Sequence, residues 1–200
     1  ESILFSLFFT GSFLREQDKN TLKKNREELD LKNIVEDLKA IHAAQEEAFK
    51  QSILKQLLQI EPTTFERFSR RLLEIYGFVD VHVTKRSRDG GIDGYGKLKI
   101  GITYLNVAFQ CKRWRTNVGR PEIDKFRGAI QGEYEQGIIF TTASFTDEAT
   151  KVMSKKGAVP VILIDGATLV NIMIDKRFGV EAEMMPVYIN ALDQVLTEDI

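Results

Sequence analysis

A glycine-rich bend, followed closely by a strand of alternating polar and apolar residues, most constrains the fold. The bend is the Gly-Gly-Ile-Asp-Gly string at positions 90–94, and the strand contains the Val-Ala-Phe-Gln-Cys-Lys-Arg-Trp string at positions 107–114. Because side chains on a strand alternate between its faces, Gln110 and Lys112 should share one face, and Phe109 and Cys111 the other. We therefore expect an apolar face packed on a helix and a polar face directed into a cleft.

Asp93 lies within the bend, where glycine permits a sharp turn and the close approach of another backbone. Its carboxylate is expected to meet the side chains of Gln110 and Lys112. Mg²⁺ prefers one or two carboxylates together with neutral oxygens and waters, so Asp93 and the amide oxygen of Gln110 are candidate metal ligands. Lys112 can orient or help deprotonate an attacking water and stabilise a pentavalent phosphate. These residue types together predict metal-dependent hydrolysis of phosphodiester bonds.

The order Asp93, then Gln110-x-Lys112, resembles the Asp…Gln-x-Lys form of the PD-(D/E)xK nuclease signature, and the chain around it resembles the Mrr-like restriction endonucleases. The similarity extends over about residues 62–180. It includes the strings Arg-Pro-Glu-Ile at 120–123, Gly-Ala-Ile-Gln-Gly at 128–132, Ile-Phe-Thr-Thr at 139–142 and Leu-Ile-Asp-Gly at 163–166. Many nucleases of this superfamily carry Glu or Asp where Gln110 stands, so this site has one negative charge fewer.

The resemblance implies a restriction-endonuclease-like α/β sandwich, with a central mixed sheet flanked by helices and preceded by a helical N-terminal segment. It implies Mg²⁺, or Mn²⁺, held by Asp93, Gln110 and the backbone carbonyl of Cys111. In this family an acidic residue on the helix before the first core strand joins the site, and Glu66 is the candidate. Thr63-x-x-Glu66 also fits a capping box, in which Thr63 caps the helix and Glu66 bonds back to the Thr63 amide.

Basic residues cluster on both sides of the predicted site, although the net charge of −1 argues against a general polyanion binder. The candidates for DNA contact are Lys85, Arg86, Arg88, Arg113, Arg115 and Arg120. Gln131 is a further candidate, because a matching glutamine in the family faces the cleft, with a surface position as the alternative. For each arginine the alternative is a solvated loop, and for Gln110 and Lys112 it is the solvated face of an edge strand.

The expected organisation is a helical segment over residues 1–61 and a nuclease catalytic domain over residues 62–200. The first part is interpreted as a linker or as the remnant of a DNA-binding or oligomerisation module. Two successive amphipathic helices are expected there, one ending near Ile41 and one from Ala48 to Leu58. The apolar run at positions 3–9 is too short to span a membrane and fits a core element, a membrane remnant or an oligomer contact.

Beyond Thr63 the pattern predicts helices and strands in alternation. Strands are expected at 79–83, at 92–98, around Gln110, at 137–141 and at 159–164, with helices after Thr63, at Pro121, after Thr146 and at 167–176. Thr146 and Asp165 are expected helix caps. Cys111 is the only cysteine, which excludes an intrachain disulfide and favours a cytoplasmic location.

The function expected from the resemblance is Mg²⁺-dependent endonucleolytic cleavage of double-stranded DNA by a homodimer, in the restriction of foreign or modified DNA. Two alternatives are a repair or junction-resolving nuclease, and a catalytically silent DNA-binding or assembly module. Nothing in these residues indicates the target sequence or a response to methylation.

Overall fold

The structure is a computed structural model that describes residues 2–84 and 91–188 of the 200-residue chain. The chain divides into two compact units. One comprises Glu1–Glu47 together with Met184–Ile200, and the other is Ala48–Glu183. The residues of the predicted site all fall within the range of the second unit, although Lys85, Arg86 and Arg88 lie outside the described residues.

The N-terminal part forms one helix, α1 (Ser2–Leu57). The prediction of two separate helices is therefore wrong. No glycine or proline separates Ile41 from Ala48, and the intervening residues are mostly good helix formers, so nothing local ends the first helix. The last turns of α1 belong to the second unit, where the side chain of Leu57 is buried in the core. The helix ends shortly before Pro62, whose ring disfavours helical conformation at the preceding residue, and Glu61 is extended.

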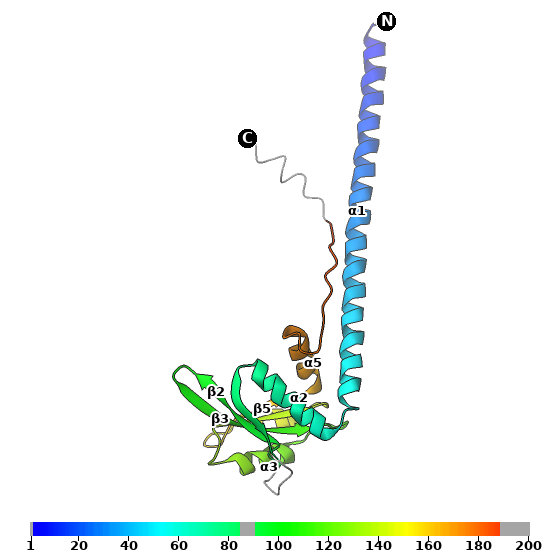
Figure 1. The fold of residues 1–200 in the computed structure, drawn as a ribbon. Coiled ribbons are helices and arrows are strands. Elements are labelled where there is room, and N and C mark those ends of the chain that lie inside the picture. The colour runs from blue at the N-terminus through cyan, green and yellow to red at the C-terminus, as the bar shows by residue number, and fades with distance from the viewer. Residues whose placement is uncertain (1, 85–90, 189–200) are drawn as a thin grey trace. The chain divides into compact units, whose positions relative to one another are not determined.

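The second unit is built on a five-stranded mixed sheet in the order β1-β2-β3-β4-β5 (Figure 1). The strands are β1 (Phe78–Val83), β2 (Gly94–Ile100), β3 (Thr103–Lys112), β4 (Gln136–Thr141) and β5 (Val161–Ile164). The first three strands pair antiparallel, and β4 and β5 continue the sheet in parallel with β3. β3 is the central strand of the sheet, between β2 and β4. Its pairing with β2 ends at Phe109, which lies opposite Gly94, the first residue of β2.

Four further helices accompany the sheet: α2 (Pro62–Ile75), α3 (Arg120–Ile130), α4 (Asp147–Thr150) and α5 (Gly166–Asp175). The predicted caps of α4 and α5 are confirmed, because Thr146 accepts from the amide of Ala149 and Asp165 from that of Thr168. The predicted capping box of α2 is wrong. Pro62 suits the first helical position because it lacks an N–H, so the helix begins before Thr63 and Glu61 takes the N-cap position without a side-chain bond.

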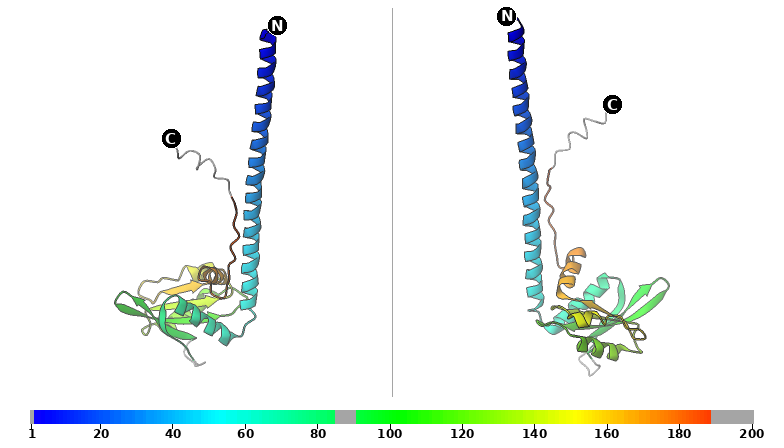
Figure 2. Two further views of the ribbon diagram at one scale, coloured as in Figure 1. Left: turned by 45° about the horizontal axis from the view of Figure 1, so that its top comes forward. Right: turned by 180° about the vertical axis from the view of Figure 1, so that it is seen from behind.

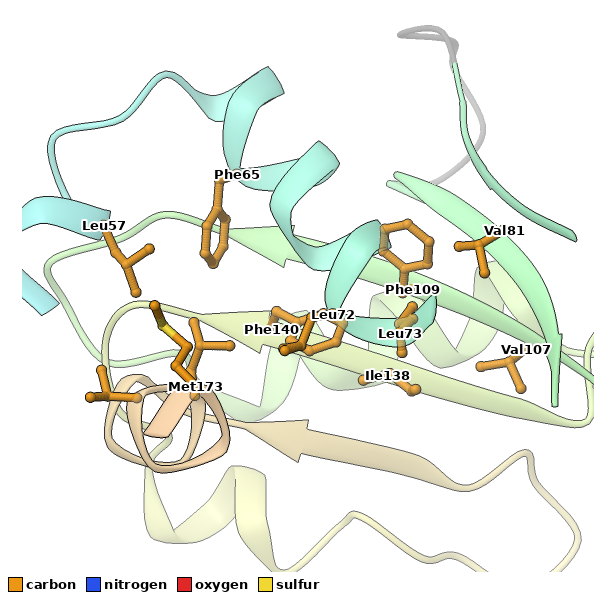
Figure 3. Packing of buried hydrophobic residues seen from close by; sticks show 12 residues of the cluster. Leu57, Phe65, Leu72, Leu73, Val81, Val107, Phe109, Ile138, Phe140 and Met173 are labelled. Carbon is orange, nitrogen blue, oxygen red and sulfur yellow. The ribbon is translucent and has the colours of Figure 1, made fainter. Parts of the chain in front are cut away.

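Apolar residues fill the space on both faces of the sheet. On one face α2, α5 and the end of α1 pack against β3 and β4 through residues such as Phe65, Leu72, Phe109, Phe140 and Met173 (Figure 3). On the other face α3 packs through Ile123, Phe126 and Ile130. These two layers on one sheet make the predicted α/β sandwich, seen from two further sides in Figure 2. Within the described residues, no helix has the length and apolar character needed to cross a membrane.

Candidate active site

The last residues of β3 divide between the two faces of the sheet. Val107, Phe109 and Cys111 pack with the cluster under α2, whereas Ala108 packs with the cluster under α3. Gln110 and Lys112 follow Ala108 in the alternation of the strand, yet their exposed fractions are only 8% and 7%. A buried lysine and a buried glutamine cost free energy unless their polar atoms are bonded. The alternative that they form the solvated face of an edge strand does not match this burial.

Asp93 lies beside the end of β3, just before β2 begins. Its backbone amide donates to the carbonyl of Phe109 at 3.0 Å, and its carboxylate oxygen Oδ2 accepts from the amide of Cys111 at 2.7 Å. The amide of Cys111 thus donates to a carboxylate, in the place where a backbone carbonyl of a longer β2 would have accepted it. On the other side, the amide of Thr84 donates to the carbonyl of Asp93 at 2.9 Å. The backbone of Asp93 is therefore held between Thr84 and Phe109, and its carboxylate is fixed at the amide of Cys111.

Gln110 is fixed through one half of its side-chain amide. Nε2 donates to the carbonyl of Gly91 at 2.6 Å, while the buried Oε1 has no hydrogen-bond partner among the described residues. Gly91 has a φ of 95°, and a Cβ built there would lie 2.2 Å from Nε2 of Gln110. Glycine is therefore required for the backbone to come this close. An unbonded buried oxygen costs about 1–3 kcal/mol, which a bound cation or water would recover.

Lys112 contacts two side chains that lie after β3 in the sequence. Its ammonium group forms an ion pair with the carboxylate of Glu122 and lies over the ring of Trp114, 4.3 Å from the ring centroid. Glu122 is in the first turn of α3, where the helix dipole favours an acidic residue. Sequence reasoning missed Glu122 as a site residue. The only signal was its place beside Pro121 at a predicted helix start, which does not reveal which strand end that helix faces.

Cys111 carries a partly buried, neutral thiol. Burial raises its pKa well above the usual value, and the negative charges of Asp93 and Glu66 raise it further. A thiol in this environment is a poor nucleophile.

Glu66 lines a pocket of about 570 Å³ on the α2 side. The other lining residues are Thr63, Arg67, Arg70, His82, Val83 and Thr84. Thr84 connects this pocket to the bend, because its hydroxyl donates to the carbonyl of Ile92 at 2.7 Å and its amide to that of Asp93. Glu66 and Thr84 thus line one pocket, and Thr84 bonds to the backbone of the segment that carries Asp93.

The predicted DNA-contacting residues lie in different surroundings. Arg113 donates to the carbonyl of Leu58 at 2.6 Å, which connects β3 to the end of α1. Arg115 is exposed, and Arg120 is exposed and pairs with Asp124. Gln131 is exposed at the C-cap of α3, at the opposite end of that helix from Glu122, and its side-chain oxygen accepts from the amide of Val159.

The candidate metal ligands at the end of β3 suit a hard cation only if neutral oxygens contribute. The described residues contain no group of three or more His, Cys, Asp or Glu side chains positioned to hold a metal ion. The atoms gathered at the end of β3 are instead one carboxylate, from Asp93, and the unbonded amide oxygen of Gln110. Mg²⁺ accepts such a set, since it keeps several waters and takes only one or two carboxylates from a protein.

Comparisons with known proteins identify the family of the chain. The family model Mrr_cat, described as a restriction endonuclease, matches residues 57–173. The chain belongs to this restriction endonuclease family. The match begins at the last residue of α1 and includes every strand, together with Glu66, Asp93, Gln110 and Lys112.

Among curated proteins, the chain is 35% identical over 148 residues to the type IV methyl-directed restriction enzyme EcoKMrr of Escherichia coli (strain K12). That alignment covers 70% of this chain and 47% of the relative, so the chain spans about half the length of the curated relative it matches.

Among solved structures, the DNA modification-dependent restriction endonuclease AspBHI is 25% identical with a TM-score of 0.55, over 66% of this chain and 36% of that one. The MspJI restriction endonuclease, in complex with a 27-mer oligonucleotide, is 22% identical with a TM-score of 0.47, over 66% of this chain and 32% of that one. The similarity to AspBHI and the family match identify the sandwich as a restriction-endonuclease-like fold.

Proposed function

We propose that the chain carries the nuclease part of a metal-dependent endodeoxyribonuclease that hydrolyses phosphodiester bonds of double-stranded DNA. The proposal rests chiefly on one observation. The buried amide oxygen of Gln110 has no partner among the described residues, at the strand end where the carboxylate of Asp93 is fixed against the backbone of Cys111. Family membership gives independent support for a nuclease.

Asp93, Gln110 and the backbone carbonyl of Cys111 are the proposed ligands of Mg²⁺, with Mn²⁺ as an alternative ion. The N–H and C=O of one strand residue point toward the same neighbouring strand. The carbonyl of Cys111 therefore points to the same side as the Cys111 amide, which donates to the carboxylate of Asp93. The bound ion would supply neutralisation of the phosphoryl oxygens and a more acidic water. With only one carboxylate in this set, we expect weak affinity for the ion unless Glu66 contributes.

Lys112 is proposed to stabilise the negative charge that develops on the phosphate under attack, and to orient the attacking water. Its ammonium group has a fixed position because Glu122 pairs with it and Trp114 lies beside it. Such preorganised charge is effective in a site that excludes water, and Lys112 is only 7% exposed. Glu66 is proposed to position water or to complete the metal shell from the α2 side.

The DNA contacts are proposed to come from cationic side chains around this strand end. Arg115 and Arg120 are exposed there, and the segment with Lys85, Arg86 and Arg88 precedes the bend in the sequence. Arg113 already donates to a backbone carbonyl, so its proposed part is to hold the following loop. Gln131, at the C-terminal end of α3, is a proposed contact for DNA that extends along this helix from the end that carries Glu122.

Restriction of foreign or modified DNA is the proposed biological setting. The relative EcoKMrr is named as methyl-directed, and AspBHI as modification-dependent. Both are much longer than this chain, so the choice of target is proposed to depend on regions beyond the nuclease fold. A homodimer is proposed because cutting two strands calls for two sites. Exposed apolar residues on α1, among them Leu31, Ile34 and Ile41, offer a contact surface whose use light scattering would test.

Plasmid cleavage tests the proposal. Methylated and unmethylated supercoiled plasmids are incubated with Mg²⁺ or Mn²⁺ and with the wild type, Asp93→Ala or Lys112→Ala. We expect the wild type to nick or linearise at least one plasmid, and both variants to lose about 100-fold or more of that rate. Cleavage that persists in both variants would mean that other residues carry the chemistry. Binding without cleavage by all three proteins would favour a silent DNA-binding module, and a preference for branched over linear DNA would favour a junction-resolving nuclease.

A further inference from the structure

A second pocket lies next to the proposed catalytic strand end, on the side of Trp114. It has a volume of about 650 Å³ and falls entirely within the unit Ala48–Glu183. Its walls come from the end of α1, the loop after β3, the loop after β4 and the start of α5. The lining residues are Gln51, Leu54, Lys55, Leu58, Gln59, Trp114, Arg115, Asn117, Thr142, Ala143, Ser144, Gly166 and Ala167.

The charged residues that line this pocket are all basic. Lys55 and Arg115 are exposed and cationic, and the described residues that line the pocket include no carboxylate. Amide groups of Gln59 and Asn117 add donors and acceptors of the kind that read the edges of nucleobases. A pocket of this size can enclose a small organic ligand, since such sites measure about 300–1,000 Å³.

Trp114 connects the pocket to the proposed active site. It contributes to the pocket wall and has an exposed fraction of 38%. The ammonium group of Lys112 lies over its ring, 4.3 Å from the ring centroid. A nucleotide beside Trp114 would therefore be a near neighbour of a phosphate held at Lys112. Bases stack on exposed aromatic rings irrespective of their sequence, and cationic side chains then track the backbone phosphates.

The backbone around Trp114 is fixed. Its carbonyl accepts from the hydroxyl of Thr142 at 2.8 Å, and its amide donates to the carbonyl of Lys112 at 2.9 Å. The wall near Gly166 is also close-packed, because a Cβ at Gly166 would lie 2.6 Å from the carbonyl of Thr142 and 2.7 Å from a methyl group of Leu54. A fixed backbone at Trp114 and close-packed walls reduce the entropy lost when a base is bound.

We propose that this pocket binds one unpaired nucleotide of the DNA substrate, with its base against Trp114 and its phosphate at Lys55 and Arg115. The proposal rests on the proposed function in one respect, that the ligand is DNA. It adds a second DNA site and a preference for substrates with a nucleotide outside the duplex close to the cut. It also assigns a role to the end of α1, which contributes Lys55 to the pocket.

The test uses the fact that Trp114 is the only tryptophan of the chain, so intrinsic tryptophan fluorescence comes from this pocket wall, and the comparison of two duplexes separates the pocket from DNA bound at Lys112. In EDTA, which prevents cleavage, the full chain is titrated with a fully paired duplex and with the same duplex carrying one unpaired nucleotide. The unpaired nucleotide should quench Trp114 at about ten-fold lower DNA concentration. Equal quenching by both duplexes, or no quenching by either, would overturn the proposal.

Variants separate stacking and charge from general affinity. Binding of a labelled oligonucleotide is followed by anisotropy for Lys55→Ala and Arg115→Ala, with Lys151→Ala as an exposed control outside the pocket. The first two should weaken binding of the duplex with the unpaired nucleotide by about five- to ten-fold each, and the control should not. Trp114→Phe should retain most of the binding and Trp114→Ala should lose it. If the pocket variants behave like Lys151→Ala, the proposal is wrong.

The outcome is distinguishable from failure of the proposed function. Plasmid cleavage without selective quenching of Trp114 would leave the nuclease proposal intact and exclude this pocket as a nucleotide site. Selective quenching by the unpaired nucleotide without any cleavage would support the pocket and contradict the nuclease proposal.

Discussion

The ammonium group of Lys112 forms an ion pair with the carboxylate of Glu122, joining the end of β3 to the first turn of α3. The Lys112 side chain is only 8% exposed, so this carboxylate is its charged partner in a region that water reaches poorly. The pair explains how the ammonium group of a lysine can be held in one orientation at this position with little exposure to solvent.

Glu122→Gln removes the charge and keeps the shape of that partner. We expect the free energy of unfolding to fall by about 1 kcal/mol, because the amide oxygen can still accept from the ammonium group but no longer balances its charge. Cleavage should slow by about 10- to 100-fold, because Lys112 is no longer held in one orientation. The measurements are urea unfolding and plasmid nicking. Glu133→Gln, at an exposed position, is the control, and a Glu122→Gln protein that matches it in both assays would contradict this role.

Gly91→Ala tests the close approach of the bend to Gln110. The substitution places a Cβ 2.2 Å from Nε2 of Gln110, at a φ of 95°. Gly132 has a φ of 91° but open space around a Cβ, so Gly132→Ala carries the same backbone strain without the clash. Each should lose about 1 kcal/mol of stability from strain. Only Gly91→Ala should also lose cleavage activity, and equal activity in both variants would mean that the position of Gln110 is unimportant.

Gln110→Glu adds the second carboxylate that many nucleases of this superfamily carry. With Asp93 nearby, it should bind Mn²⁺ about ten-fold more tightly, because affinity for a divalent cation rises with the number of charged ligands. Without metal it should be less stable than the wild type, since a second negative charge is buried beside the first. Thermal unfolding with increasing Mn²⁺ measures both effects. A metal-induced rise in Tm no larger than that of the wild type would remove Gln110 from the proposed ligand set.

The partly buried thiol of Cys111 predicts a loss of stability in alkaline solution. Its pKa in the folded protein is raised, so the unfolded chain releases this proton first as the pH rises. Stability contributed by the thiol is therefore complete below the unfolded pKa of about 8.5 and declines above it by up to about 1.4 kcal/mol per pH unit. Urea unfolding across this range should show a steeper decline for the wild type than for Cys111→Ala. Parallel pH profiles would show that the pKa of the thiol is not raised in the folded protein.

The parts of the fold set by local chemistry were predictable from sequence. Alternation on β3 indicated the two faces of that strand, and the side chains of Thr146 and Asp165 identified the starts of α4 and α5. The start of α2 was misplaced because Thr63 and Glu66 match a capping box, whereas Pro62 already supplies a favourable first position. Glu122 could not be assigned because its role depends on how α3 lies against the end of β3. That arrangement follows from packing of Ile123 and Phe126 on the sheet, which sequence spacing does not specify.

The most direct test of the account is Mg²⁺-dependent nicking of plasmid DNA by the wild type and by Asp93→Asn. Asparagine keeps an oxygen that can accept from the amide of Cys111, so the fold should persist and urea unfolding should change little. Loss of the negative charge should nevertheless lower the nicking rate by about 100-fold or more. A well-folded Asp93→Asn protein that nicks DNA as fast as the wild type would contradict the central claim that Asp93 holds the metal ion.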